Sequence, residues 1–380
     1  MKRALPLLLA ACLAGCTASG PVADLAPGER PALATDEAGL WLATDAIEAR
    51  LKTSGRRLAD PALEAYLHGI ACRLNPEHCA AVRIYVMELP HFNASIMPNG
   101  AMQVWSGLLL RVDNEAQLAA VIGHELAHFE RRHTLQRWRD LRRKAAWSEV
   151  VGTLGGDLIG TVGQAAMMMS VMAYSREQER EADALGLARL PPAGYDAREA
   201  ARVWQLVIDE QRRSDEPRGS IFLASHPTPP ERLETLTALA AQQPPPATRQ
   251  DRVEPGLAAA IAPHRSRWLR DELRRQKPAE TEWLIERLFA RSPGDPELHF
   301  ARGELRRLRA GPGDLQAAVE DYRRALAAPD PPPLVWRSLG TALAQLQQRV
   351  AARDALATYL ELAPDAADAP MIRTMIEGMS

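Results

Sequence analysis

Residues 121–133 read VIGHELAHFERRH, and the HELAH at 124–128 constrains the fold more than any other feature of the chain. Side chains four residues apart lie one above the other on a helix. A helical segment would therefore bring His124 and His128 to one face, where both imidazoles can bind one metal ion. Glu125 is rotated by about 100° around the helix axis, which suits it to contact a water on the metal rather than the metal itself. The fold must accommodate a helix with a metal-binding face.

Two further patterns favour a helix here. Asn114 and Gln117 have the spacing of a capping box that would begin it. Apolar residues then recur at the spacing of a buried helical stripe: Leu118, Ile122, Leu126 and Phe129. The HExxH pattern on a buried helix is typical of zinc-dependent hydrolases. The alternative is a chance match on an amphipathic helix with solvated charges.

The N-terminus begins MKRALPLLLAACLAGC, with two basic residues, a short apolar run and small residues before Cys16. The run is too short to span a bilayer and suits a signal peptidase. The pattern resembles the lipobox of bacterial lipoproteins, which implies removal of residues 1–15, lipid on the thiol of Cys16 and a flexible tether over residues 16–36. Thr17, rather than Asp, follows the cysteine. By the sorting rule of such lipoproteins this implies a periplasmic protein anchored to the outer membrane. An ordinary secretory signal with an incidental cysteine is the alternative.

Export changes the interpretation of the remaining cysteines. Cys72 and Cys79, separated by six residues, would lie in an oxidising compartment, and we predict a disulfide between them. A metal site that uses His78 is the alternative, but it would need further ligands at suitable spacing.

Charge and hydropathy restrict the partners of the chain. The net charge of −2 gives no reason to expect nucleic-acid binding. We interpret the basic stretch 131–144 as a solvated helix face, with contact to lipid phosphates as the alternative. The uncharged stretch 158–174 is short, and glycines lie within and before it. A single crossing there would also put HELAH and the acidic segment that follows on opposite sides of a membrane. We interpret it as a buried helix beside the site, so membrane contact is expected through the lipid anchor only.

The acidic segment is SREQEREADALG at 175–186. A catalytic zinc ion usually takes three protein ligands and leaves the fourth position for water, so two histidines need one more partner. Glu179 and Asp183 share a helix face, but so do Glu177 and Glu181, and a solvated charged helix fits all four. Spacing alone therefore leaves the third ligand open.

The combination of HELAH, SREQEREAD at 175–183 and SHPTPPER at 225–232 resembles the BepA-like periplasmic metalloproteases, relatives of HtpX, Oma and the CAAX prenyl endopeptidases. The resemblance covers roughly residues 40–240. It implies an α+β, gluzincin-like metallopeptidase domain over residues 37–241, mostly helical with a small sheet. Two alternating segments, Val82 to Leu89 and Met102 to Leu109, are the predicted strands. We place the second at the sheet edge, where an extended substrate would pair.

The family's E-x-x-x-D pattern falls on Glu179 and Asp183. The resemblance implies that Glu179 is the third ligand to one zinc ion, beside the two histidines of HELAH. It implies that Asp183 hydrogen-bonds a ligating imidazole and fixes its tautomer, and a role as proton donor stays open.

In the family's HP-x-x-x-x-R motif the histidine falls on His226 and the arginine on Arg232. His226 would cap the metal or stabilise an oxyanion, whereas a plain loop histidine is the alternative. Glu125 would be the general base of peptide hydrolysis. The other histidines, His68 and His133 among them, have no partner pattern in the sequence.

A Pro-rich linker is expected at 242–260, and residues 261–380 are predicted to be all-helical, tetratricopeptide-like repeats. Six positions fit the repeat pattern in register: Trp336, Leu339, Gly340, Ala352, Leu356 and Pro364. An ordinary helical bundle is the alternative. The resemblance implies a docking surface for unfolded outer-membrane proteins or for their assembly machinery. It implies a zinc endopeptidase that removes misfolded or stalled envelope proteins. The rival hypothesis is a non-proteolytic chaperone or scaffold that acts through the repeats.

Overall fold

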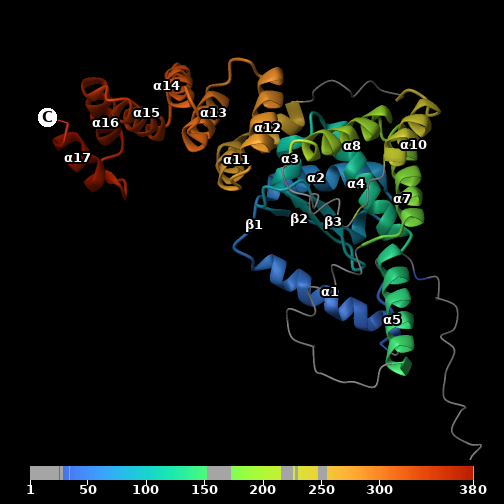
Figure 1. Cartoon of the computed structure of the whole chain (residues 1–380). Coiled ribbons are helices and arrows are strands. Elements are labelled where there is room, and N and C mark those ends of the chain that lie inside the picture. The colour runs from blue at the N-terminus through green and yellow to red at the C-terminus, as the bar shows by residue number, and fades with distance from the viewer. Residues whose placement is uncertain are drawn as a thin grey trace, which may run out of the picture.

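The computed structural model describes residues 25, 29–33, 35–151, 173–214, 226, 230–246 and 255–379. The predicted signal peptide, the anchor Cys16 and most of the uncharged stretch 158–174 lie outside these residues. Within them the chain is mostly helical with one small sheet, as predicted (Figure 1). None of the described helices is both long and apolar enough to cross a membrane.

The N-terminal part of the chain contains the sheet and the helices around it. In chain order these are α1 (Asp36–Lys52), β1 (Arg57–Leu58), α2 (Pro61–Leu74), η1 (Cys79–Ala81), β2 (Arg83–Met87), β3 (Ala94–Ile96), β4 (Ala101–Trp105), α3 (Ser106–Arg111), α4 (Glu115–Glu130), α5 (His133–Val151), α7 (Arg176–Ala188), α8 (Arg198–Gln211) and α10 (Pro230–Ala241).

The sheet has the order β1-β2-β4-β3, with β2 and β4 parallel and both outer pairs antiparallel. Successive side chains of a strand point to opposite faces. Ile84 and Val86 therefore pack into the core that α2 and α4 share, while Tyr85 and Met87 pack toward α1. Helices thus cover both faces of the sheet.

The prediction for the second strand was wrong in two respects. The segment 102–109 is a strand only to Trp105, and the rest belongs to α3. At Gly107 the chain passes the backbone of His91 so closely that a Cβ there would lie 2.4 Å from its atoms, so the first turn of α3 requires a glycine. The strand is also central rather than at the edge, because the turn at Gly100 (φ 83°) lets β3 pair with its free side.

The helix that carries HELAH, α4, is buried along almost its whole length. Leu118 and Ile122 of the predicted stripe are fully buried. Asn114 Oδ1 accepts a hydrogen bond from Gln117 N at 2.9 Å, as expected of the cap. The reciprocal bond differs from the prediction, because Gln117 Oε1 accepts from Asp113 N at 2.8 Å instead of from Asn114.

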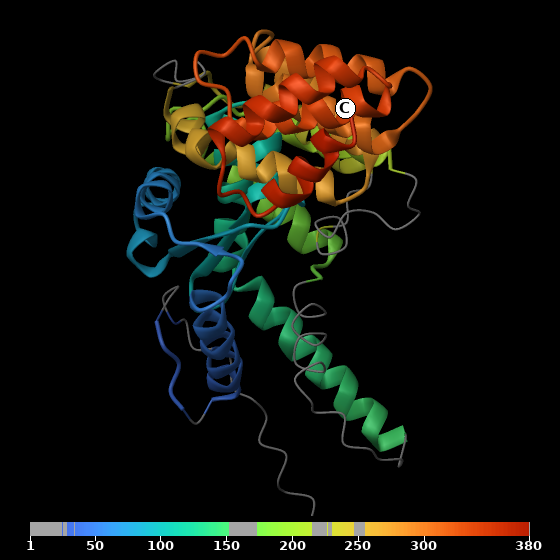
Figure 2. The same cartoon turned by 90° about the vertical axis from the view of Figure 1, so that its left-hand side faces the viewer.

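Helices alone make up the described C-terminal part: α11 (Pro255–Arg274), α12 (Pro278–Arg291), α13 (Pro296–Arg309), α14 (Asp314–Ala325), α15 (Pro333–Gln345), α16 (Arg349–Leu362) and α17 (Ala369–Glu377). They lie at one end of the molecule, while α1 and α5 project at the other (Figures 1 and 2). Helices α13 and α14 pack as a pair, as do α15 and α16. Their identity as tetratricopeptide repeats stays a prediction, as do the expected domain boundaries.

The first C-terminal helix shares its core with the N-terminal part. Trp268 of α11 is fully buried, and its indole N–H donates to Glu88 at 3.1 Å. The fully buried Arg111 of α3 contacts Glu210 of α8 at 2.7 Å and Glu272 of α11 at 3.1 Å. A buried cation between two carboxylates thus ties α8 and α11 to the end of the sheet.

Cys72 and Cys79 lie within bonding distance of each other, with their Cα atoms 4.7 Å apart. The geometry suits the predicted disulfide, which stays a prediction for the exported protein. His68, not His78, is the imidazole beside them, with Nδ1 3.5 Å from Cys72 Sγ.

Candidate metal centre

Two glycines set the distance between the helices that form the site. At the crossing of α4 and α7, a Cβ on Gly186 would lie 2.8 Å from His124 N and 2.9 Å from Gly123 C. The backbones therefore touch without intervening side chains. Helix α7 begins with the capping box of Ser175 and Gln178. Glu179 and Asp183 of this helix face His124 of HELAH.

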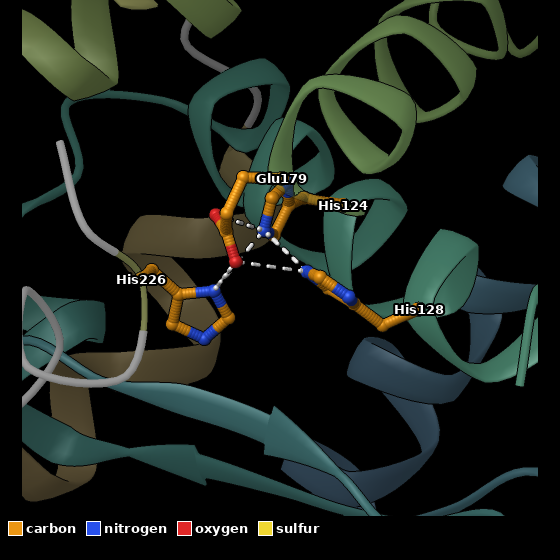
Figure 3. Close-up of side chains that lie close together, drawn as sticks. All are labelled: His124, His128, Glu179 and His226. Atoms are coloured by element: carbon orange, nitrogen blue, oxygen red, sulfur yellow. Dashed lines mark hydrogen bonds and ion pairs between the residues drawn. The ribbon is translucent and has the colours of Figure 1, made fainter. Parts of the chain in front are cut away.

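His124 and His128 point their Nε2 atoms at each other across 3.0 Å, and Glu179 of α7 faces both (Figure 3). Glu179 Oε1 is 3.5 Å from His128 Nε2, and Oε2 is 3.6 Å from His124 Nε2. With His226, these buried residues offer four ligand atoms within 4.8 Å of one another. The structure thus brings together the three predicted ligands from two distant stretches.

The spacing and chemistry of these atoms fit a tetrahedral metal ion. Zinc binds imidazole nitrogen and carboxylate oxygen at about 2.0–2.1 Å, which places neighbouring ligand atoms of a tetrahedron about 3.3–3.4 Å apart. The ligand-atom separations given above, from 3.0 to 3.6 Å, bracket that value. Two imidazoles and one carboxylate are also a donor set that such an ion accepts.

His226 is buried, and Figure 3 shows its ring beside Glu179. Its Nδ1 lies 3.0 Å from Glu179 Oε1 and 3.3 Å from His124 Nε2, and its Nε2 lies 3.6 Å from Glu125 Oε1. These distances put the imidazole within reach of both the predicted ligands and the predicted base.

Glu125 is 1% exposed, and its Oε1 has no hydrogen-bond partner among the residues that the structure describes. Burial raises the pKa of Glu125, and the neighbouring imidazoles of His226 and His124 oppose this only in part. A carboxylate with a raised pKa, and with an oxygen that makes no hydrogen bond to the described residues, is suited to accept a proton beside the cluster.

Asp183 and Arg232 lie behind the predicted ligands His124 and Glu179. Asp183 Oδ1 is 3.0 Å from His124 Nδ1, the ring nitrogen that faces away from the cluster. Arg232 donates to both oxygens of Asp183, and its Nη1 forms an ion pair with Glu179 Oε2 at 2.6 Å, outside hydrogen-bond geometry. Burial alone would raise the pKa of Asp183, but Arg232 and His124 outweigh it and hold that pKa below its usual value. Asp183 is therefore an anion that can accept the Nδ1 proton of His124.

Further residues of the site were not predicted. We expected no partner for His133, yet its Nδ1 lies 2.8 Å from His128 Nδ1. Arg132, with φ 57°, separates α4 from α5 and turns the chain so that His133 faces back toward the site. The Tyr174 ring stacks on His128 at 3.8 Å, and Arg232 lies 3.8 Å above the Trp204 ring. The contact between His133 and His128 could have been indicated only by their separation of five residues, across the end of a helix.

Comparison with known proteins agrees with this geometry. The profile of peptidase family M48 matches residues 57–240. The beta-barrel assembly-enhancing protease of Escherichia coli K12 is 28% identical over 201 residues, which cover 48% of this chain and 40% of that protein. The same-named protein of Yersinia pestis is 27% identical over 198 residues (48% and 40%). The mitochondrial metalloendopeptidase OMA1 of Bos taurus is 29% identical over 176 residues (42% and 32%). The chain thus spans less than half the length of each of these relatives. Residues 57–240 are a peptidase family M48 domain, and the chain is homologous to the beta-barrel assembly-enhancing proteases.

Proposed function

We propose that the protein is a zinc endopeptidase of envelope protein quality control, which cleaves misfolded or stalled envelope proteins. The observation that carries this proposal is the convergence of His124, His128 and Glu179 beside the buried Glu125. The names of the homologous proteases support the substrate class.

Each polar group of the site has a task in this proposal. Zinc held by the two histidines and Glu179 would polarise a peptide carbonyl and lower the pKa of water. Glu125 accepts a proton from the attacking water and gives it to the leaving amine nitrogen. Asp183 holds the tautomer of His124, and Arg232 orients both Asp183 and Glu179.

His226 and the sheet edge control access in this proposal. His226 Nδ1 lies as close to Glu179 and to His124 as a fourth ligand would, so this imidazole caps the resting site and must move before substrate binds. The substrate is an extended chain that pairs with β3, an outer strand of the sheet.

The proposed location is the periplasm, with the chain held to the outer membrane by lipid on Cys16. Replacement of Cys16 by Ser should release it from the membrane fraction. The C-terminal helices would act as repeats that dock unfolded outer-membrane proteins or their assembly machinery.

The decisive experiment combines metal analysis with proteolysis. Wild-type protein should contain about one zinc ion per chain and should cleave a denatured β-barrel protein. Glu179→Gln should lose zinc. Glu125→Gln should keep zinc but lose cleavage, by roughly 10²–10⁴-fold. Glu177→Gln is the matched control, because this side chain of the same helix is 80% exposed.

The scaffold hypothesis predicts a different outcome in cells. If Glu125→Gln rescues every envelope defect of a deletion strain as well as the wild type does, the protein acts through its repeats without proteolysis, and the peptidase proposal fails.

A further inference from the structure

His133 is a fully buried histidine that lies outside the predicted ligand set. Its Nδ1 is 2.8 Å from His128 Nδ1, and its Nε2 is 3.1 Å from Glu181 Oε2. The three side chains therefore form a line from the cluster to the protein surface, where Glu181 is 44% exposed.

The tautomers along this line follow from the metal cluster. His128 directs Nε2 at Glu179 and His124, so a metal ion there requires an unprotonated Nε2 and leaves the proton on Nδ1. His128 Nδ1 then donates to His133 Nδ1, which must be the acceptor. The proton of His133 lies on Nε2 as a result and is donated to Glu181.

Neighbouring groups hold this arrangement in place. Arg131 Nε lies 2.9 Å from the other oxygen of Glu181 and keeps that carboxylate oriented. Tyr174 stacks on His128, and its hydroxyl lies 3.0 Å from Thr134 Oγ1. The plane of the His128 ring is therefore restrained from a second direction.

We propose that His133 and Glu181 are positioning residues that fix the tautomer and orientation of His128 for metal binding. This inference rests on the proposed function, since it assumes that the cluster binds zinc. It gives each HELAH histidine its own carboxylate from α7: Asp183 directly behind His124, and Glu181 behind His128 through one intervening imidazole. Groups in this position typically change metal affinity by about 10–100-fold when removed.

The test measures the zinc dissociation constant by competition with a chromogenic chelator, on the full chain. His133→Ala should bind zinc about 10–100-fold more weakly than wild type. His133→Asn should bind more tightly than His133→Ala, because its Oδ1 retains an acceptor near the place of Nδ1. Glu181→Gln should cause a smaller loss, and the control Glu177→Gln should cause none.

A double variant separates a line of contacts from two unrelated effects. Because Glu181 acts only through His133, Glu181→Gln should weaken zinc binding less in the His133→Ala background than in wild type. Circular dichroism and thermal unfolding in chelator check that each variant folds. If His133→Ala fails this check, Glu181→Gln against Glu177→Gln carries the test, since both side chains reach solvent.

The outcomes distinguish this inference from the proposed function. Wild-type protein that binds zinc, together with equal affinity of wild type and His133→Ala, would overturn the inference alone. Equal weakening by Ala and Asn, or equal effects of Glu181→Gln and Glu177→Gln, would also overturn it. Failure of wild-type protein to bind zinc would remove both proposals.

Discussion

Gly186→Ala tests whether the metal centre depends on the close crossing of α4 and α7. The added Cβ would lie 2.8 Å from His124 N, 2.9 Å from Gly123 C and 3.0 Å from His124 Cα. All three are backbone atoms, so no flexible side chain can move aside. Carbon contacts are favourable at about 3.5–4.0 Å, so α7 must shift by roughly half an ångström or more at this point.

The shift should affect metal binding more than it affects folding. Overpacking costs about 1–3 kcal/mol, and the higher helix propensity of alanine offsets about 1 kcal/mol of that. We therefore expect a net destabilisation of roughly 0–2 kcal/mol. Metal–ligand distances tolerate only about 0.2 Å. Glu179 and Asp183 are on the displaced helix, so zinc affinity should fall on the order of tenfold or more, like the loss of a supporting group.

The assay compares zinc dissociation constants and thermal unfolding with those of Gly69→Ala. Gly69 is also helical, but a Cβ there meets nothing within 4 Å. That variant should keep its zinc affinity and gain up to about 1 kcal/mol of stability. If Gly186→Ala matched Gly69→Ala in both measurements, the two helices would not meet at backbone contact and our account of the site would be wrong.

His226→Ala should raise peptidase activity toward an unfolded substrate, because it removes the proposed cap; equal or lower activity would argue against capping. Arg111→Leu removes the buried cation between Glu210 and Glu272, which keep Arg275 at 3.7 Å and 2.5 Å, and should destabilise the fold by up to about 3–5 kcal/mol in urea unfolding; a loss below about 1 kcal/mol would contradict the ion-pair geometry. The hydrogen bond from Arg83 is the main cause that lowers the pKa of Glu48 from 4.5 to about 2. The stability that Glu48 contributes is therefore present above the unfolded-state pKa of 4.5 and lost as the pH falls toward 2. Glu48→Gln should consequently be less stable than wild type at pH 7, by a margin that shrinks below about pH 4.5; a margin independent of pH would refute this. Chelation of zinc should lower the unfolding temperature of wild type but not that of Glu179→Gln.

The local features of the site were accessible from the sequence. The helical period and the HExxH spacing both act over a few residues, so the face of α4 that carries His124 and His128 could be predicted directly. The cap at Asn114 was predictable for the same reason, although Asp113 took the reciprocal hydrogen bond.

Other features depend on contacts that no local pattern encodes. The edge of the sheet could not be assigned, because strand order depends on which segments pair across the chain. The role of His133 depends on the left-handed backbone at Arg132, a residue type that rarely adopts this conformation. Helical periodicity ends at such a residue, and the relative position of the next helix cannot be calculated from spacing.

The proposed third ligand, Glu179, could be assigned from the sequence only in part, and a glycine explains why. Glu179 and Asp183 share a face with Gly186, since the three positions are separated by four and three residues. Glu177 and Glu181 share a different face. A glycine within a helix weakens it by about 1 kcal/mol relative to alanine. Close packing against another helix, which a side chain would prevent, can compensate for this loss. Gly186 therefore marks the face that α4 approaches, and only the carboxylates on that face can reach the HELAH histidines directly. Glu181 lies off this face and reaches the site only where His133 extends toward it. In the proposed site, one helix thus supplies both a ligand and the groups that orient the other ligands.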